Sequence, residues 1–160
     1  MTTVVPVVPD HPAFDQVAGL FDAYRVHYGQ PSSPARTASW LRDQLAQHRL
    51  AAAAAIRGDQ VCGFITVATM PASLRLGTAW SIRDLYVAAD HRRTGVARAL
   101  LHHAILGARV AGARRVSLQT ETDNSPALKL YTAIGFTPVA GLDLLNLTLD
   151  PLPRDPRDTA

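Results

Sequence analysis

The sequence predicts a mixed α/β fold in one domain spanning residues 1–150, and three observations support this fold class. Strand and helix patterns follow in the order strand, two helices, three strands, helix, strand, helix and two strands. The segment 78–120 is a strand, a helix and a strand, and such a crossover makes its two strands parallel or nearly so. With 160 residues the chain has the length of one hydrophobic core.

Two helices follow a short first strand. Residues 4–8 are predicted as an edge strand, where Pro6 is tolerated. Apolar residues then recur at helical spacing from Phe14 until Gly29 ends the helix. A second helix opens at Ser33-Pro34 and runs to about His48. Its predicted apolar side consists of Trp40, Leu41 and Leu45.

Three successive strands are predicted at 51–56, 61–69 and 78–87. The turn Gly58-Asp59 joins the first two. The alanine run 51–55 favours a helix by propensity alone, but a segment of six residues before a Gly-Asp turn favours a strand.

The second half of the chain contains the strongest helix pattern. Beyond Gly95 the apolar residues fall on one helical face until the helix ends near Gly112. Further elements are a strand at 116–120, a helix at 126–134 closed by Gly135, and two final strands at 136–140 and 142–149. Residues 151–160 are predicted to form a flexible tail, because they are rich in proline and charge.

The charge pattern argues against a nucleic-acid partner. The formal net charge is +3, but the 16 basic residues, all arginine except Lys129, are scattered along the chain. The only clusters are Arg92-Arg93 and Arg114-Arg115. Because Lys129 is the only lysine and no Gly-Lys-Ser/Thr sequence exists, a Walker-type nucleotide site is excluded.

Neither a metal, a disulfide nor a membrane is expected. Cys62 is the only cysteine and lies in an apolar run, so we expect a buried, inert thiol. His102 and His103 are adjacent on a helix and cannot face one metal ion. No apolar run approaches the roughly 20 residues that a bilayer requires. With no signal-peptide pattern, the expected location is the cytoplasm.

A turn between a strand and a helix is the candidate binding site. The strand ends in Asp84-Leu85-Tyr86-Val87, the turn reads Arg92-Arg93-Thr94-Gly95-Val96-Ala97, and the strongest helix begins there. Such a turn directs backbone N–H groups and the positive helix end at one point, which suits a pyrophosphate. Gly95 lets the backbone approach closely. The alternative is a solvated basic turn.

The pattern Arg92-x-x-Gly95-x-Ala97 after Leu-Tyr-Val resembles the acetyl-CoA signature of the GNAT N-acetyltransferases. A second stretch, Asn124-Ser-Pro-Ala127 with Leu130-Tyr131 and Gly135-Phe136, resembles that family's other motif. Residues 24–32 look like the first-helix segment of a bacterial branch related to histone and polyamine acetyltransferases. Arg93 and Ala97 stand where glycine is commoner in the family, and Arg83-Asp84 stands where diamine acetyltransferases have Glu-Asp, which argues against a polyamine acceptor.

The resemblance implies the GNAT fold, in which a mostly antiparallel central sheet contains one splayed parallel pair and is flanked by helices. It also implies direct transfer of an acetyl group from acetyl-CoA, the co-substrate, to a primary amine of a small molecule or peptide. The residues that it assigns to acetyl-CoA are Leu85, Tyr86, Val87, Arg92, Arg93, Thr94, Gly95, Val96, Ala97, Asn124, Ala127 and Tyr131. For Asn124 the alternative role is helix capping.

Two residues are candidates for catalysis. The resemblance implies that Tyr131 protonates the departing CoA thiolate; the alternative is a core tyrosine. An alkyl ammonium has a pKa of about 10.4, so an amine acceptor needs a base or a water path. Asp84 is the candidate base or amine anchor, and pairing with an arginine is the alternative. Strand alternation places Asp84 on one face with Ile82 and Tyr86, unless a bulge reverses this.

Tyr24 and Tyr28 are candidates for acceptor binding, although such spacing is more often part of a core. Glu121 and Asp123 are expected to be solvated loop residues. A homodimer is expected from the exposed edge of the apolar strand 142–149. A catalytically silent acyl-CoA-binding module is the alternative function, and a small basic nucleic-acid-binding protein is a third, unrelated alternative, whose DNA affinity should collapse with salt.

Overall fold

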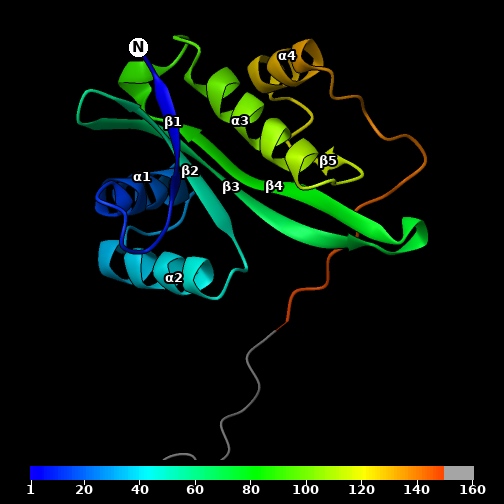
Figure 1. The fold of residues 1–160 in the computed structure, drawn as a ribbon, viewed down its shortest axis with the longest axis horizontal. Coiled ribbons are helices and arrows are strands. Elements are labelled where there is room, and N and C mark those ends of the chain that lie inside the picture. The colour runs from blue at the N-terminus through cyan, green and yellow to red at the C-terminus, as the bar shows by residue number, and fades with distance from the viewer. Residues whose placement is uncertain (150–160) are drawn as a thin grey trace, which may run out of the picture.

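The computed structural model describes residues 1–149 and contains one five-stranded sheet with the order β1-β2-β3-β4-β5 (Figure 1). All neighbouring strands are antiparallel except β4 and β5, which are parallel. The predicted α/β class and the parallel pairing across 78–120 are confirmed. The strands are β1 (Thr3–Val7), β2 (Ala51–Arg57), β3 (Gln60–Ala72), β4 (Gly77–Val87) and β5 (Val116–Ser117), and the helices are α1 (Phe14–His27), α2 (Pro34–Ala46), α3 (Val96–Val110) and α4 (Ser125–Ile134). The predicted tail 151–160 lies outside the described residues.

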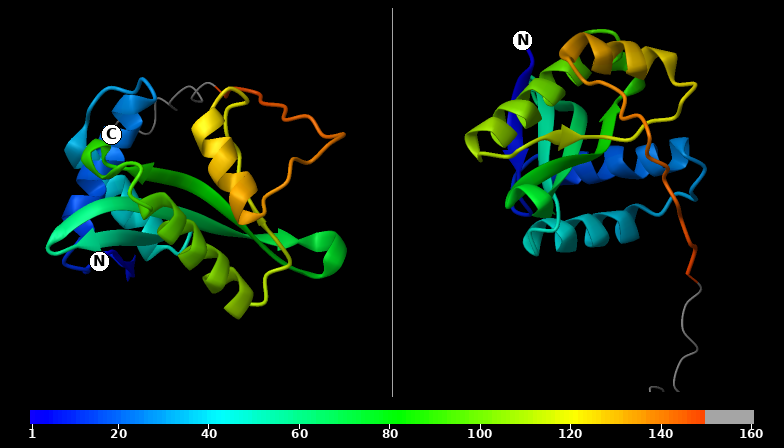
Figure 2. Two further views of the ribbon diagram at one scale, coloured as in Figure 1. Left: turned by 90° about the horizontal axis from the view of Figure 1, so that it is seen from above. Right: turned by 90° about the vertical axis from the view of Figure 1, so that its right-hand side faces the viewer.

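The sheet separates two helical layers (Figure 2). Helices α1 and α2 cover one face, and α3 and α4 lie on the other. Side chains of β3 alternate between the layers: Phe64 packs with the α1 and α2 side chains, whereas Ile65 packs with those of α3. Each face therefore has its own apolar core, and both faces of the central strands are buried.

Strand β2 consists of five alanines followed by Ile56 and Arg57. Ala52 and Ala54 belong to the core beside α1, and Ala53 and Ala55 belong to the core beside α3. Helix propensity favours Ala in a helix, but this run is hydrogen-bonded between β1 and β3. The strand prediction is confirmed, and the small methyl groups of β2 contribute to both apolar cores.

A β-bulge in β4 changes which residues share a face. Thr66 pairs with Asp84, but Val67 pairs with Ile82, so Arg83 is an extra residue. Ile82 consequently packs in the core beside α3, and Asp84 faces α1 and α2 with Tyr86. The expectation that Ile82 shares a face with Asp84 was wrong, because the bulge reverses the alternation between them.

Three predicted strands differ from the structure. The strand expected at 116–120 is paired only over Val116–Ser117, and residues 136–149 form no strand. The two final strand predictions were therefore wrong. Pro138 and Gly141 interrupt the segment, and its leucines change phase between Leu144 and Leu145, so no single face is apolar. Leu142, Leu144, Leu145, Leu147 and Leu149 are exposed. The homodimer stays a prediction without the edge strand that motivated it.

Asp22 ties α1 to the start of α2. The residue is 6% exposed, and its carboxylate accepts hydrogen bonds from the Ser32 hydroxyl at 2.7 Å, the Ser33 amide at 2.9 Å and the Thr37 hydroxyl at 2.8 Å. The Arg25 guanidinium lies 3.4 Å away. These groups, the Ser32 hydroxyl foremost, lower the pKa of Asp22 from 3.8 to about 2. The network therefore links α1 to the first turn of α2 and to the two serines before it.

We expect Asp22→Asn to lower the urea midpoint of unfolding at neutral pH, because buried donors then lose a charged acceptor. Because folding lowers this pKa, the carboxylate stabilises the fold above its ordinary pKa, and the stabilisation disappears as the pH falls from about 4 to about 2. Urea titrations across that range should show a smaller acid-induced loss of stability in the variant than in the wild type. Asp43→Asn, at an exposed carboxylate on α2, is the control. An equal acid-induced loss of stability in the wild type and both variants would contradict the stabilising role of the Asp22 carboxylate.

Candidate functional site

Two cavities adjoin β4, one on the α1–α2 face of the sheet and one in the gap where β4 and β5 diverge. The first, here the β4–β5 cleft, has a volume of about 890 Å³ and lies between β4, the segment 118–121 and α4. The second, the α1–α2 pocket, has a volume of about 670 Å³ and lies between the first two helices and Asp84. Tyr24 of α1 lines both cavities, so they adjoin at its ring.

The β4–β5 cleft exists because its two strands diverge. They pair only at Trp80 with Val116 and at Ser81 with Ser117. The bulge at Arg83 follows directly, and bulges bend a strand and end its pairing. Beyond it, Leu85 and Val87 of β4 face the cleft opposite Leu118 and Thr120. Backbone N–H groups along this edge of β4 have no neighbouring strand and can bind a ligand.

The turn before α3 forms the basic end of the cleft. Arg92 and Arg93 both line it. The Arg92 Nε donates to the Val87 carbonyl at 3.1 Å, and its guanidinium lies 5.6 Å from the Tyr86 ring centre. Gly95 caps α3 with φ 86°, a left-handed conformation that glycine adopts without strain. The turn therefore brings two guanidinium groups to the positive end of a 15-residue helix, which favours an anion.

Thr94 is held by other contacts. Its hydroxyl donates to the His91 carbonyl at 2.6 Å, and Arg57 donates to the Thr94 carbonyl at 3.0 Å. Thr94, Gly95 and Val96 do not line the cleft, and the Val96 side chain is buried in the core beside α3. The other nine residues that the motifs assign to acetyl-CoA do line it.

Helix α4 supplies the opposite wall. Asn124 caps it by accepting a 3.4 Å hydrogen bond from the Ala127 amide, and Pro126 lies in its first turn. Asn124 and Ala127 also line the cleft. The capping role of Asn124 is thus observed, and its side chain stands at the cleft as well.

Tyr131 is half-buried at the cleft wall. Its ring meets Phe136 edge-on, with centroids 6.0 Å apart. Burial first, then the nearby Tyr28 and Glu121, raises the pKa of Tyr131 above its ordinary value. A raised pKa keeps the phenol protonated at neutral pH, so Tyr131 can donate a proton or a hydrogen bond into the cleft.

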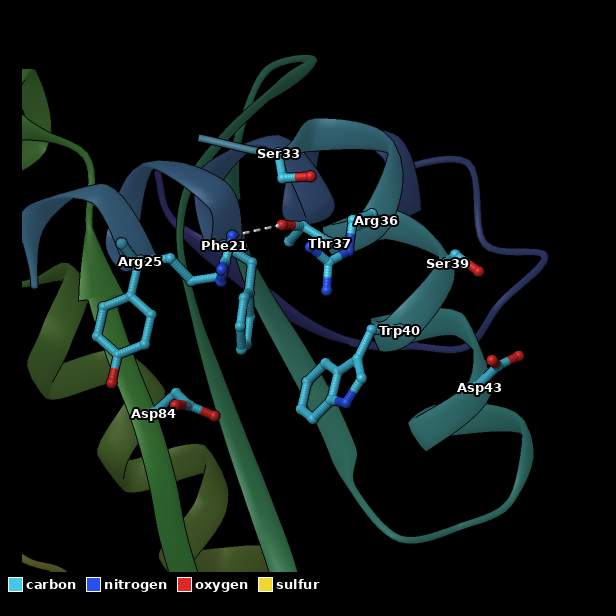
Figure 3. A pocket seen from close by; sticks show the side chains of 10 residues that line it. Phe21, Arg25, Ser33, Arg36, Thr37, Ser39, Trp40, Asp43 and Asp84 are labelled. Atoms are coloured by element: carbon cyan, nitrogen blue, oxygen red, sulfur yellow. Dashed lines mark hydrogen bonds between the residues drawn. The ribbon is translucent and has the colours of Figure 1, made fainter. Parts of the chain in front are cut away.

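Asp84 faces the α1–α2 pocket instead (Figure 3). The buried Thr66 hydroxyl donates a hydrogen bond to its carboxylate and fixes its position. Burial and then the charge of Asp84 raise the pKa of Tyr24, which therefore stays a neutral phenol beside the carboxylate. Asp84 makes no ion pair with an arginine within residues 1–149, so the alternative of a structural ion pair is not supported.

The structure adds residues that the sequence motifs missed. In the cleft these include His27, Arg83, Gln119 and Lys129. Glu121 is an exposed loop residue, as expected, and it also lines the cleft. Segment 118–121 follows the carboxyl end of a parallel strand, where ligands commonly bind in α/β sheets. This position could have identified the segment as part of the site. Tyr28 lines the cleft and Tyr24 both cavities, whereas Asp123 lines neither.

Within residues 1–149, no group of three or more His, Cys, Asp or Glu side chains could hold a metal ion. In the same range no helix is long and apolar enough to cross a membrane.

Known proteins resemble this chain in sequence and in fold. An uncharacterized N-acetyltransferase of Bacillus subtilis, YhfO, is 29% identical over 120 residues, which cover 75% of this chain and 80% of the relative. The crystal structure of a probable acetyltransferase superposes with a TM-score of 0.86 at 31% identity and covers 93% of this chain and 99% of its own. A predicted acetyltransferase from Clostridium acetobutylicum, solved with acetyl-CoA, shares the fold with a TM-score of 0.71 at 16% identity, covering 91% and 96% of the two chains. The Acetyltransferase (GNAT) family model matches residues 15–136, and the chain therefore belongs to this family.

Proposed function

We propose that the protein is an N-acetyltransferase that binds acetyl-CoA in the β4–β5 cleft and a primary amine in the α1–α2 pocket. The placement of β4 between the two cavities carries this proposal. Asp84 faces one cavity, and Leu85 and Val87 face the other. A ligand in one cavity can meet a ligand in the other beside Tyr24, where the cavities adjoin, without an enzyme-bound intermediate.

The cleft fits the parts of acetyl-CoA by chemistry. Its basic end, with Arg92, Arg93 and the N-terminus of α3, suits a pyrophosphate. The unpaired edge of β4 offers backbone N–H groups to a pantetheine arm and to the thioester oxygen. When bound, acetyl-CoA supplies a thioester that an amine nitrogen can attack with release of a thiolate.

We assign roles to side chains that line the two cavities. In this assignment Tyr131, which stays protonated in the cleft, gives its proton to the thiolate as the carbon–sulfur bond breaks. Asp84 attracts the ammonium form of the acceptor and takes one proton from it, directly or through water, so that the neutral amine can attack. The second proton, which the nitrogen loses after the attack, passes through water and restores the Tyr131 phenol. Cys62 is fully buried and lines neither cavity, which supports direct transfer over an acyl-cysteine.

Acetyl-CoA turnover across a library of primary amines, with calorimetry of acetyl-CoA binding, tests the proposal. Binding with turnover of at least one amine is the expected result. Binding without turnover of any amine would favour the catalytically silent acyl-CoA-binding module. No binding would contradict both functions.

Asp84→Asn should raise KM for a cationic amine about tenfold or more and shift the pH–rate profile upward. The amide keeps the shape and can still contact Thr66, but it neither attracts an ammonium nor accepts its proton. Without Asp84 as a base, the acceptor ammonium must lose its proton to solvent, and this requires a higher pH. Steady-state kinetics from pH 6 to pH 10 measure both effects, with Asp59→Asn, at an exposed carboxylate that lines neither cavity, as the matched control. Wild-type KM and pH dependence in Asp84→Asn would exclude Asp84 from both roles.

A further inference from the structure

We propose that the amine acceptor also carries a carboxylate, as an amino acid does, and that Arg36 binds this carboxylate while Asp84 holds the amine. The inference rests on the proposed function, because it names the class of amine that the α1–α2 pocket takes. It follows from the charges, the apolar surface and the helix end that this pocket presents.

The four charged side chains that line the pocket are not equally available. Arg25 is bonded to the Asp22 carboxylate, the Pro31 carbonyl and the Thr37 hydroxyl. Figure 3 shows the hydrogen bond from Arg25 to Thr37 and the carboxylate of Asp43 directed away from the pocket centre. Arg25 is thus neutralised within the helix pair, and Asp43 is turned to solvent.

Arg36 and Asp84 are the remaining pair. Within residues 1–149, Arg36 makes no hydrogen bond or ion pair with another side chain. In Figure 3 its guanidinium points into the pocket between Phe21 and Trp40, and Asp84 lies on the β4 side. The pocket therefore has one positive and one negative pole, which is the complement of a zwitterion.

Apolar surface lies between these poles. The rings of Phe21 and Trp40 are 5.9 Å apart, and Trp40 is 49% exposed at the pocket. An aromatic side chain with this exposure is available to pack against the carbon skeleton of a ligand. The combination favours an amino carboxylate with an apolar body over a compact ion.

The start of α2 strengthens the positive pole. Arg36 lies in the first turn of this 13-residue helix, where the helix dipole favours an anion. The negative charge of Asp22 nearby is balanced by Arg25 and by three hydrogen bonds. A guanidinium can hold a carboxylate through two parallel hydrogen bonds, a geometry that favours a carboxylate over a neutral amide.

The experiment compares acceptors that differ only in the carboxylate. Phenylalanine is paired with phenylalaninamide, and 6-aminohexanoate with 6-aminohexanamide. For the wild type we expect kcat/KM to be at least about tenfold higher for the acid of the preferred pair, the size expected for a charge-assisted hydrogen bond. Arg36→Gln should lower kcat/KM for the acid about tenfold or more and leave that for the amide within about twofold.

Two further variants sharpen the comparison. Arg36→Glu should reverse the preference and favour a diamine such as 1,6-diaminohexane over 6-aminohexanoate. Arg98→Gln makes the same chemical change at an exposed arginine of α3 that lines neither cavity. It should leave the ratio of kcat/KM for the acid to kcat/KM for the amide unchanged in both pairs. Circular dichroism of each variant establishes that the fold is retained.

The outcomes separate this inference from the proposed function. If amines are acetylated but kcat/KM is equal for acids and amides, the inference is overturned and the proposed acetyltransferase function is retained. The same holds if Arg36→Gln lowers kcat/KM for the acid and the amide equally. A wild-type preference for diamines that increases in Arg36→Gln also overturns it. Failure to turn over any amine overturns the proposed function itself.

Discussion

Tyr131→Phe should lower kcat about 100-fold or more and leave the affinity for acetyl-CoA within about threefold. General-acid catalysis contributes about 10²–10⁴-fold, and it acts only as the thiolate leaves. The ring keeps its contact with Phe136, so packing at the cleft wall is preserved. Because burial raises the pKa of Tyr131, its hydroxyl is protonated in assays near neutral pH.

Steady-state kinetics give kcat, and calorimetry gives the affinity. Thr132→Val, which removes a hydroxyl from the adjacent exposed residue of α4, is the control and should keep wild-type turnover. If Tyr131→Phe also keeps wild-type kcat, Tyr131 is a packing residue and another group protonates the thiolate.

Ala97→Glu should weaken acetyl-CoA binding about 100-fold or more. Ala97 is the second residue of α3 and lines the cleft beside Arg92 and Arg93. A glutamate in the first turn is compatible with the helix, whose positive end it complements, so the fold should persist. The same carboxylate occupies the proposed site of the pyrophosphate and repels its negative charge. Gly95 is a poorer choice for this test, because φ 86° strains any side chain there.

Calorimetry with acetyl-CoA measures the loss, and thermal unfolding confirms folding. Ala97→Gln adds the same volume without the charge and should weaken binding less. Arg98→Glu introduces a carboxylate at the next residue, outside the cleft, and should bind nearly as the wild type does. Wild-type affinity in Ala97→Glu would show that the acetyl-CoA site lies elsewhere.

Local signals predicted the parts of the fold that depend on local interactions. Helix α3 is visible in its apolar periodicity, and α4 is bounded by Asn124, Pro126 and Gly135. The bulge at Arg83 is a property of how β3 and β4 align, so the sequence of β4 alone does not reveal it. The failure at 136–149 has a related cause, because leucine-rich segments form strands only where an edge pairs with them.

The candidate site divides in the same way. Arg92, Ala97 and Tyr131 were found because they belong to short motifs at helix ends. Arg36 and Trp40 were not found as site residues, because their role depends on how α2 packs. The apolar face predicted for α2 included Trp40 with Leu41 and Leu45, but only the two leucines are buried. An amphipathic pattern does not distinguish a core residue from one that lines a pocket.

The alanine strand β2 also affects how the chain finds its alignment during folding. Sliding most strands by one residue exchanges their inward and outward side chains, and the shifted pairing is unstable because the wrong side chains are then buried. Sliding β2 replaces one methyl group by another over Ala51–Ala55, so packing discriminates poorly there. The alignment must be set at the ends of the run, by Ile56 and by the two-residue turn, where Gly58 has φ 58°. Lengthening that turn by one residue should therefore permit a second, nearly isoenergetic pairing of β2 with β3.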